Sequence, residues 1–150
     1  MRRRLFSFVS GGCVALAVAA CGTSNPAQPS SVSATAGATG TASVTTPQPL
    51  QPSDAAQVAY TSQPVTLSVK NAVTTGSGAV TYTFEIATDS GFASKVQTKA
   101  DVAAGGNGQT SVTLDTLTGG SDYYWHARVQ QDGTTGVFGT TRKFSVGPQV

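Results

Sequence analysis

The stretch Tyr123-Tyr124-Trp125-His126-Ala127-Arg128-Val129 indicates the fold most directly. Every second side chain from Tyr123 to Val129 is aromatic or aliphatic, and the side chains between them are more polar. Alternation with a period of two is typical of a β-strand that buries one face and exposes the other. The stretch therefore predicts a half-buried strand with Trp125 in the core and His126 as a solvated residue on the opposite face.

Shorter segments with the same alternation lie elsewhere in the chain. They are residues 65–69, 82–86, 112–114 and 144–146, with a weaker strand starting at residue 96 and a loose first strand near residues 57–60. Clusters of Gly, Asn and Asp separate these segments, and none of them has a sustained helical period. Seven short alternating strands predict an all-β fold, a seven-stranded antiparallel β-sandwich.

The residues that precede the central strand resemble a known family. Leu117 lies six residues before Tyr123, with Gly119 in the turn between them. This pattern resembles the corner that leads into strand F of fibronectin type III domains, where proline is usual at the position of Gly119. Residues 84–92, 132–133 and 142–146 also fit that family, so the resemblance covers roughly residues 49–147. An immunoglobulin relative is the alternative, although the Cys-Trp-Cys signature of antibody-type domains is missing.

The resemblance implies roles for three residues. Tyr123 is expected to form a tyrosine corner, in which the ring closes the edge of the core and the hydroxyl bonds to backbone a few residues upstream. Leu117 and Trp125 are expected to pack beside Tyr123. A fibronectin type III-like fold by itself implies no particular function.

The N-terminus has the features of a secretory signal peptide. Three arginines follow Met1, and residues 5–20 carry no charge and end in small residues before Cys21. These 16 residues are diluted by Ser and Gly, whereas a membrane-spanning helix needs about 20 predominantly apolar residues. The segment Val18-Ala19-Ala20-Cys21 resembles the lipobox of bacterial lipoproteins.

That resemblance implies cleavage before Cys21 and attachment of lipid to its thiol. The alternative is ordinary signal cleavage after residues 17–19, which would leave Cys21 as a plain thiol. Gly22 after the cysteine resembles the class sorted to the outer membrane in hosts that have two membranes. The expected location is therefore the cell envelope, with a lipid anchor at Cys21 holding the protein to a membrane.

The composition changes after Cys21 and again near residue 48. No charged or aromatic residue occurs from Gly22 to Ser53, and small polar residues, Ala and Pro dominate this segment. Such a segment cannot bury enough apolar surface to offset the entropy of ordering. The chain is therefore divided into a signal peptide at 1–20, a lipidated and disordered tether at 21–47, and a fibronectin type III-like domain at 48–147.

Charge and cysteine content exclude several classes of protein. The chain has nine Lys and Arg against seven Asp and Glu, and loss of three signal-peptide arginines leaves six against seven. A mature charge of −1 lacks the basic patch of a nucleic-acid-binding protein. Cys13 would leave with the signal, so no disulfide is expected.

Catalytic and metal-binding residues are not expected. His126 is the only histidine, and no cysteine remains free after lipidation of Cys21. A hydrolytic triad or a zinc site needs more such side chains. The sequence therefore predicts a non-enzymatic protein with no metal and no cofactor.

One face of the predicted sheet is the candidate binding surface. Its residues are Glu85, Tyr124, His126, Arg128 and Lys143, brought together because strands C, F and G share a sheet in the family that the chain resembles. Tyrosine and arginine are enriched in interface hot spots. The alternative is a solvated face in which Glu85 pairs with Arg128 and no partner binds.

These features predict a membrane-anchored envelope lipoprotein that displays a non-catalytic β-sandwich as a binding or spacer module. The expected partners are the membrane, through lipid at Cys21, and an envelope protein or polysaccharide. One alternative is an accessory subunit that docks other envelope or secretion proteins. A remote alternative is a carbohydrate-related enzyme or carbohydrate-binding module.

Overall fold

The computed structural model describes residues 42–150. The predicted signal peptide, the lipidation site at Cys21 and the tether up to residue 41 lie outside the described residues. Within residues 42–150 no helix has the length and apolar character needed to cross a membrane.

The described residues form an all-β structure. Its strands are β1 (Gln48–Gln51), β2 (Ala56–Val58), β3 (Thr66–Lys70), β4 (Val80–Ala87), β5 (Lys95–Ala103), β6 (Gln109–Thr113), β7 (Ser121–Gln131), β8 (Thr134–Thr135) and β9 (Arg142–Val146), with a short 3₁₀ turn at Tyr60–Ser62. The seven strands predicted from the sequence do not include β1 and β8, which are too short and too polar to show alternation. The strand that begins near residue 96 corresponds to β5, which has nine residues.

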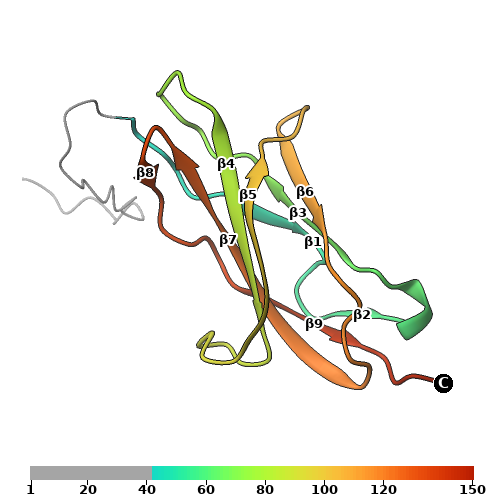
Figure 1. Ribbon diagram of the computed structural model, residues 1–150. Helices are drawn as coiled ribbons and strands as arrows, with labels where there is room; N and C mark the ends of the chain where they lie inside the picture. Colours follow the sequence, from blue (N-terminus) through green and yellow to red (C-terminus); the bar gives the residue numbers. More distant parts are fainter. Residues whose placement is uncertain (1–41) are drawn as a thin grey trace, which may run out of the picture. The chain divides into compact units, whose positions relative to one another are not determined.

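The strands form two sheets (Figure 1). One has the order β1-β3-β6, and the other has the order β2-β9-β7-β4-β5, with β8 paired to the end of β7. β2 runs parallel to β9, so the prediction of a purely antiparallel fold is wrong for this pair. The physical reason is that the alternation within a strand shows which face is buried but not in which direction the neighbouring strand runs.

Both sheets contribute to one hydrophobic core. The buried apolar residues are Val65, Leu67, Val69, Tyr82, Phe84, Ile86, Leu114, Leu117, Tyr123, Trp125, Ala127, Val129, Phe144 and Val146. Trp125 is opposite Ile86 across the β4–β7 pair, and its ring lies 6.4 Å from that of Phe84. The two alternating segments that the sequence marked most strongly are therefore adjacent strands, and the arrangement is consistent with a β-sandwich.

Ordered pairing begins before residue 48. Val44 forms an isolated bridge with Thr74, and the amide of Thr45 donates to the carbonyl of Val73 at 3.0 Å. Val44 also packs against the core. Two backbone contacts and one apolar side chain therefore attach residues 44 and 45 to the domain.

Tyr123 closes one edge of the core. Its ring packs 5.7 Å from that of Phe144, and its hydroxyl donates to the carbonyl of Thr118 at 2.9 Å. The chain reverses between these residues at Gly120, which adopts a φ of +71°. Leu117, Tyr123 and Trp125 all lie in the core, with exposed fractions of 4 % or less.

Tyr123→Phe tests the value of that hydroxyl. The change retains the ring and removes one hydrogen bond, so the free energy of unfolding should fall by about 1 kcal/mol. Chemical denaturation followed by circular dichroism measures this difference. Tyr124→Phe is the matched control, because its half-exposed ring lies on the opposite face of the same strand and the change should cost less.

Candidate functional site

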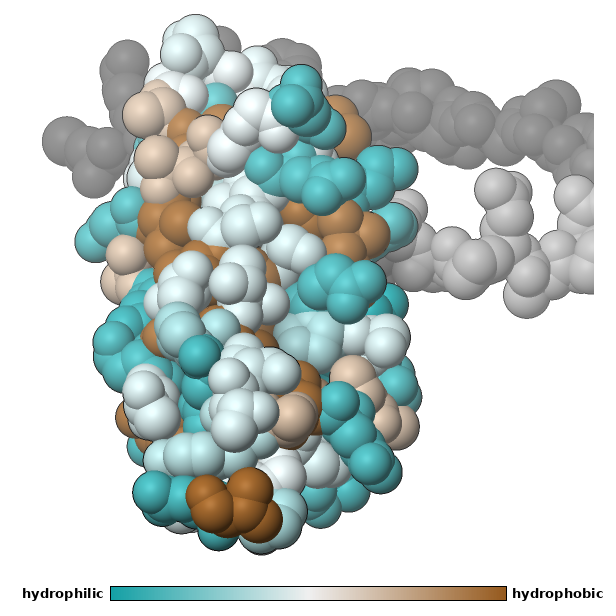
Figure 2. All heavy atoms as spheres, turned by 90° about the vertical axis from the view of Figure 1, so that its right-hand side faces the viewer, coloured by the Kyte–Doolittle hydropathy of each residue, from teal (hydrophilic) through white to brown (hydrophobic). Residues whose placement is uncertain are grey.

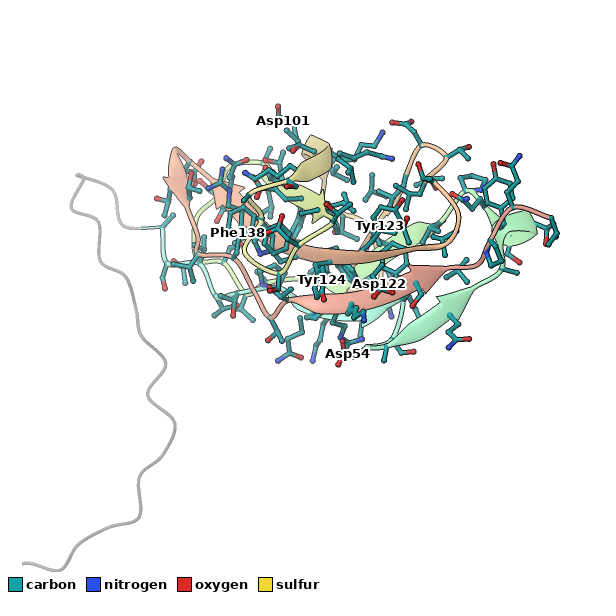
Figure 3. The ribbon with its side chains drawn as sticks, turned by 90° about the horizontal axis from the view of Figure 1, so that it is seen from below. Asp54, Asp101, Asp122, Tyr123, Tyr124 and Phe138 are labelled. Atoms are coloured by element: carbon teal, nitrogen blue, oxygen red, sulfur yellow. The ribbon has the colours of Figure 1, made fainter. Side chains whose placement is uncertain are left out.

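The outward face of β4, β7 and β9 brings the predicted surface residues together. Glu85 is opposite His126, and Tyr124 lies between Ala87 on one side and Lys143 on the other. Tyr123 and Tyr124 project from β7 to opposite sides (Figure 3). The predicted neighbours are thus adjacent, but their exposure differs from the expectation.

His126 is not a solvated residue, and that prediction is wrong. Only 9 % of its surface is exposed, because aromatic rings cover both faces of the imidazole. The ring of Phe92 lies 3.6 Å from one face at an interplanar angle of 9°, and that of Phe138 lies 3.8 Å away at 15°. Two nearly parallel rings at such short distances must occupy opposite faces.

Arg128 extends this stack by one more planar group. Its guanidinium carbon lies 4.7 Å from the centre of the Phe138 ring. His126 already occupies one face of that ring, so the guanidinium takes the other. We call the series Phe92, His126, Phe138 and Arg128 the outer stack. Figure 3 shows Phe138 among the side chains near one end of the domain.

Local backbone structure explains how the two phenylalanines reach this face. Phe92 lies in the β4–β5 turn with a φ of +56°. The carboxylate of Asp89 holds this turn by accepting hydrogen bonds from the amides of Gly91, Ala93 and Ser94 at 2.7–3.1 Å. These bonds, chiefly those from Ser94 and Ala93, hold the pKa of Asp89 below its usual range.

Phe138 comes from the segment between β8 and β9. The amides of Gly136 and Gly139 donate to the carbonyls of Val129 and Ala127, each at 2.8 Å. This segment therefore runs alongside β7. Phe138 lies between the two glycines and is placed over the outward face of the sheet. Sequence reasoning missed both phenylalanines because neither belongs to an alternating strand. The only signal was an aromatic residue next to glycine in each connection.

Glu85 is also buried rather than exposed, and it does not pair with Arg128. Its Oε1 lies 2.9 Å from Nζ of Lys95, and its Oε2 lies 3.2 Å from Nε2 of His126. Burial raises the pKa of Glu85, but hydrogen bonds from Lys95 and His126 and the charge of Lys95 outweigh it, and the net pKa is lowered. The predicted Glu85–Arg128 pair fails because Lys95 of β5 reaches the carboxylate instead.

The environment of His126 favours the neutral form of its imidazole. Burial lowers its pKa below the ordinary 6.5, and this outweighs the opposite effect of Glu85, while the charges of Lys95 and Arg128 lower it further. The 3.2 Å contact is therefore a hydrogen bond from a neutral ring to a carboxylate, with the proton on Nε2.

This lowered pKa predicts a pH dependence of stability. A histidine whose folded pKa lies below its unfolded value binds protons more readily in the unfolded state. Its stabilising effect is complete above the unfolded value of 6.5 and is lost as the pH falls through the folded value. The free energy of unfolding should thus decrease on acidification before Glu85 titrates.

Because the chain has one histidine, the test is direct. The pKa of His126 can be measured by NMR, and stability can be measured across about pH 7.5 to 5. His126→Phe retains three stacked rings without a titrating group and should remove the decrease in that window. A measured pKa above 6.5 would contradict the prediction.

Tyr124 and Lys143 lie beside the outer stack in a more exposed cluster. Nζ of Lys143 is 2.8 Å from Oδ2 of Asp122, and the backbone amide of Lys143 donates to Asp54 at 3.0 Å. The bond to Asp122 raises the pKa of Lys143, and that bond together with one from Ser145 lowers the pKa of Asp122. The charge of Lys143 is therefore already balanced by Asp122. Tyr124 and Arg128 remain as the strongest accessible candidates for contact with a partner.

Other parts of the described domain offer little chemistry. Among residues 42–150 no group of three or more His, Cys, Asp or Glu side chains is arranged to hold a metal ion. A shallow hollow lined by Gln57, Val58, Ala59, Ser145 and Gly147 contains no titratable side chain. Figure 2 shows a face on which hydrophobic residues form separate small patches among hydrophilic and near-neutral ones.

The chain was compared with known proteins in three ways. No protein-family model matches it. No curated protein and no solved structure matches it significantly.

Proposed function

We propose that this protein is a lipid-anchored envelope lipoprotein that displays a fibronectin type III-like domain as a non-catalytic binding module. The anchor is lipid on Cys21, and in a host with two membranes Gly22 favours the outer membrane. The proposal for the anchor depends on the lipobox resemblance of residues 18–21.

Two features support the fibronectin type III-like assignment. β5 follows β4 in the sequence and pairs with it in the same sheet. In a constant-type immunoglobulin domain the strand that follows strand C is strand D, which joins the other sheet, with strands A, B and E. The hydroxyl of Tyr123 bonds to the backbone of Thr118, as in a tyrosine corner. The lack of a Cys-Trp-Cys signature also favours this assignment over the immunoglobulin alternative.

The observation that carries the binding role is the outer stack. It places Arg128 at its end beside half-buried Phe138, on the same face as half-exposed Tyr124. A solvated spacer surface has no need of aromatic residues held over a sheet by two separate loops. Arginine and aromatic residues fixed by their neighbours are typical of interface hot spots.

The surroundings of His126 support a non-catalytic role. A general base must reach the proton of a nucleophile or substrate. Both faces of this imidazole are covered by phenyl rings, and its Nε2 bonds to Glu85. The side chain therefore acts as a structural member of the outer stack.

Crosslinking in intact cells tests the anchor and the binding face together. The parent should fractionate with membranes and crosslink to a defined partner. Cys21→Ser should block lipidation and the maturation that follows it. The double variant Tyr124→Ala and Arg128→Ala should remain membrane-bound and lose the crosslinked partner.

Lys70→Ala is the control for general loss of charge, because Lys70 is exposed on β3 of the other sheet. It should crosslink like the parent. A Cys21→Ser variant that is processed and membrane-bound like the parent would refute the anchor. An unchanged crosslinking pattern in the double variant would refute the binding face and favour a spacer or a different docking surface.

A further inference from the structure

The cations of the described domain differ in how their charges are satisfied. Three are paired with carboxylates, namely Lys95 with Glu85, Lys99 with Asp115 and Lys143 with Asp122. Arg142 donates from Nη1 to the backbone carbonyls of Leu50 and Pro52 at 3.0 and 3.5 Å. Within residues 42–150, Lys70 and Arg128 are the two cations with neither an ion pair to a described carboxylate nor a hydrogen bond to a described backbone carbonyl.

Of these two cations, Arg128 is held in a fixed orientation. Its guanidinium lies over the Phe138 ring, and its buried Nε has no hydrogen-bond partner among the described residues. The outer stack, and not a carboxylate, therefore orients the group. A planar guanidinium presents paired N–H donors that match the two oxygens of a carboxylate, and less entropy is lost on binding when its orientation is already set.

The surface beside Arg128 is partly apolar. Phe138 is half-buried, and the neighbouring Val137 is 52 % exposed. An acidic polysaccharide would offer a carboxylate surrounded by hydroxyl groups, which gain nothing from these side chains. A polypeptide segment with an acidic residue next to an apolar one would satisfy both the cation and the apolar surface.

We propose that Arg128 and Phe138 form a docking site for an acidic segment of a partner polypeptide, with Asp or Glu beside an apolar side chain. The carboxylate binds the guanidinium of Arg128, and the apolar side chain packs on Val137 and against the edge of the Phe138 ring, whose two faces are covered by His126 and Arg128. This inference rests on the proposed binding role and specifies its partner chemistry. The domain has six cations against seven anions, so the attraction is local to this site.

Titration with short probes tests the site on the full chain purified in mild detergent. The first probe is a capped peptide with one Glu between two Val residues, and the second is the same peptide with Gln in place of Glu. The third probe is an oligogalacturonate. The readout is the NMR signal of the Arg128 Nε–H group together with the dissociation constant.

The Glu peptide should shift the Arg128 signal and bind about tenfold more tightly than the Gln peptide, as expected for a hydrogen bond to a charged group. Arg128→Gln should abolish the difference between the two peptides. Arg128→Lys should lose most of it despite keeping the charge, because an ammonium lacks the planar pair of donors. Lys70→Gln should behave like the parent.

Phe138→Leu provides a second route to the same conclusion. It removes the platform under Arg128 while leaving the cation in place, so the preference for Glu should fall. Equal binding of the two peptides by the parent, or binding too weak to detect, would overturn the proposal. Tighter binding of oligogalacturonate would overturn it in favour of a polysaccharide. If these probes fail while the double variant still loses its crosslinked partner in cells, the proposed function stands and only the acidic-peptide assignment falls.

Discussion

Replacing Trp125 by alanine is expected to lower the free energy of unfolding by about 3–5 kcal/mol. Trp125 is fully buried and packs against Phe84 in the centre of the core. The change removes the largest buried side chain and leaves a cavity between the two sheets. Because a domain of this size has only about 5–15 kcal/mol of stability, the variant should be close to unfolding at ambient temperature. Urea denaturation followed by far-ultraviolet circular dichroism measures the effect.

Trp125→Phe and Tyr124→Ala are the matched controls. The Nε1 of Trp125 is buried and has no hydrogen-bond partner among residues 42–150. Trp125→Phe keeps an aromatic ring and removes that unsatisfied donor, so it should cost much less than alanine. Tyr124→Ala removes a half-exposed ring from the opposite face of the same strand and should also cost less. A melting temperature of Trp125→Ala equal to that of the parent would contradict the assignment of the core.

Glu85→Ala is expected to have the second-largest effect, a loss of about 1.5–3 kcal/mol. The carboxylate accepts from both Lys95 and His126 and is 11 % exposed. Its removal leaves the buried Nε2–H of His126 without an acceptor. The free energy of unfolding falls because that donor stays out of water with no hydrogen bond. Lys95 is 45 % exposed and can be hydrated, so the loss stays below that of breaking a fully buried ion pair.

The pair of Lys99 and Asp115 supplies the comparison for Glu85. These side chains are 2.8 Å apart, but that of Asp115 is 78 % exposed. Asp115→Ala should cost only about 0–1 kcal/mol because water screens and replaces the contact. If Glu85→Ala costs no more than Asp115→Ala in the same denaturation experiment, the polar contacts beneath the outer stack do not stabilise the domain.

The core of this protein could be predicted from local sequence. Alternation over residues 82–86 and 123–129 marked two strands that the structure places side by side, with Phe84 and Trp125 facing inward. Burial of one sheet face imposes a period of two on each strand separately, so each strand carries its own signal. The lipidation of Cys21 also follows from a local motif, and it stays a prediction because that residue lies outside the described range.

The outer stack was decided only by tertiary structure. Phe92 and Phe138 belong to two different connections, and both fold over His126 on the middle strand. Alternation states which side of a strand faces the core, but it says nothing about whether distant loops cover the other side. The parallel pairing of β2 with β9 could not be predicted from alternation either. The direction of a strand relative to its neighbour depends on how the chain crosses between sheets and not on the pattern within a strand.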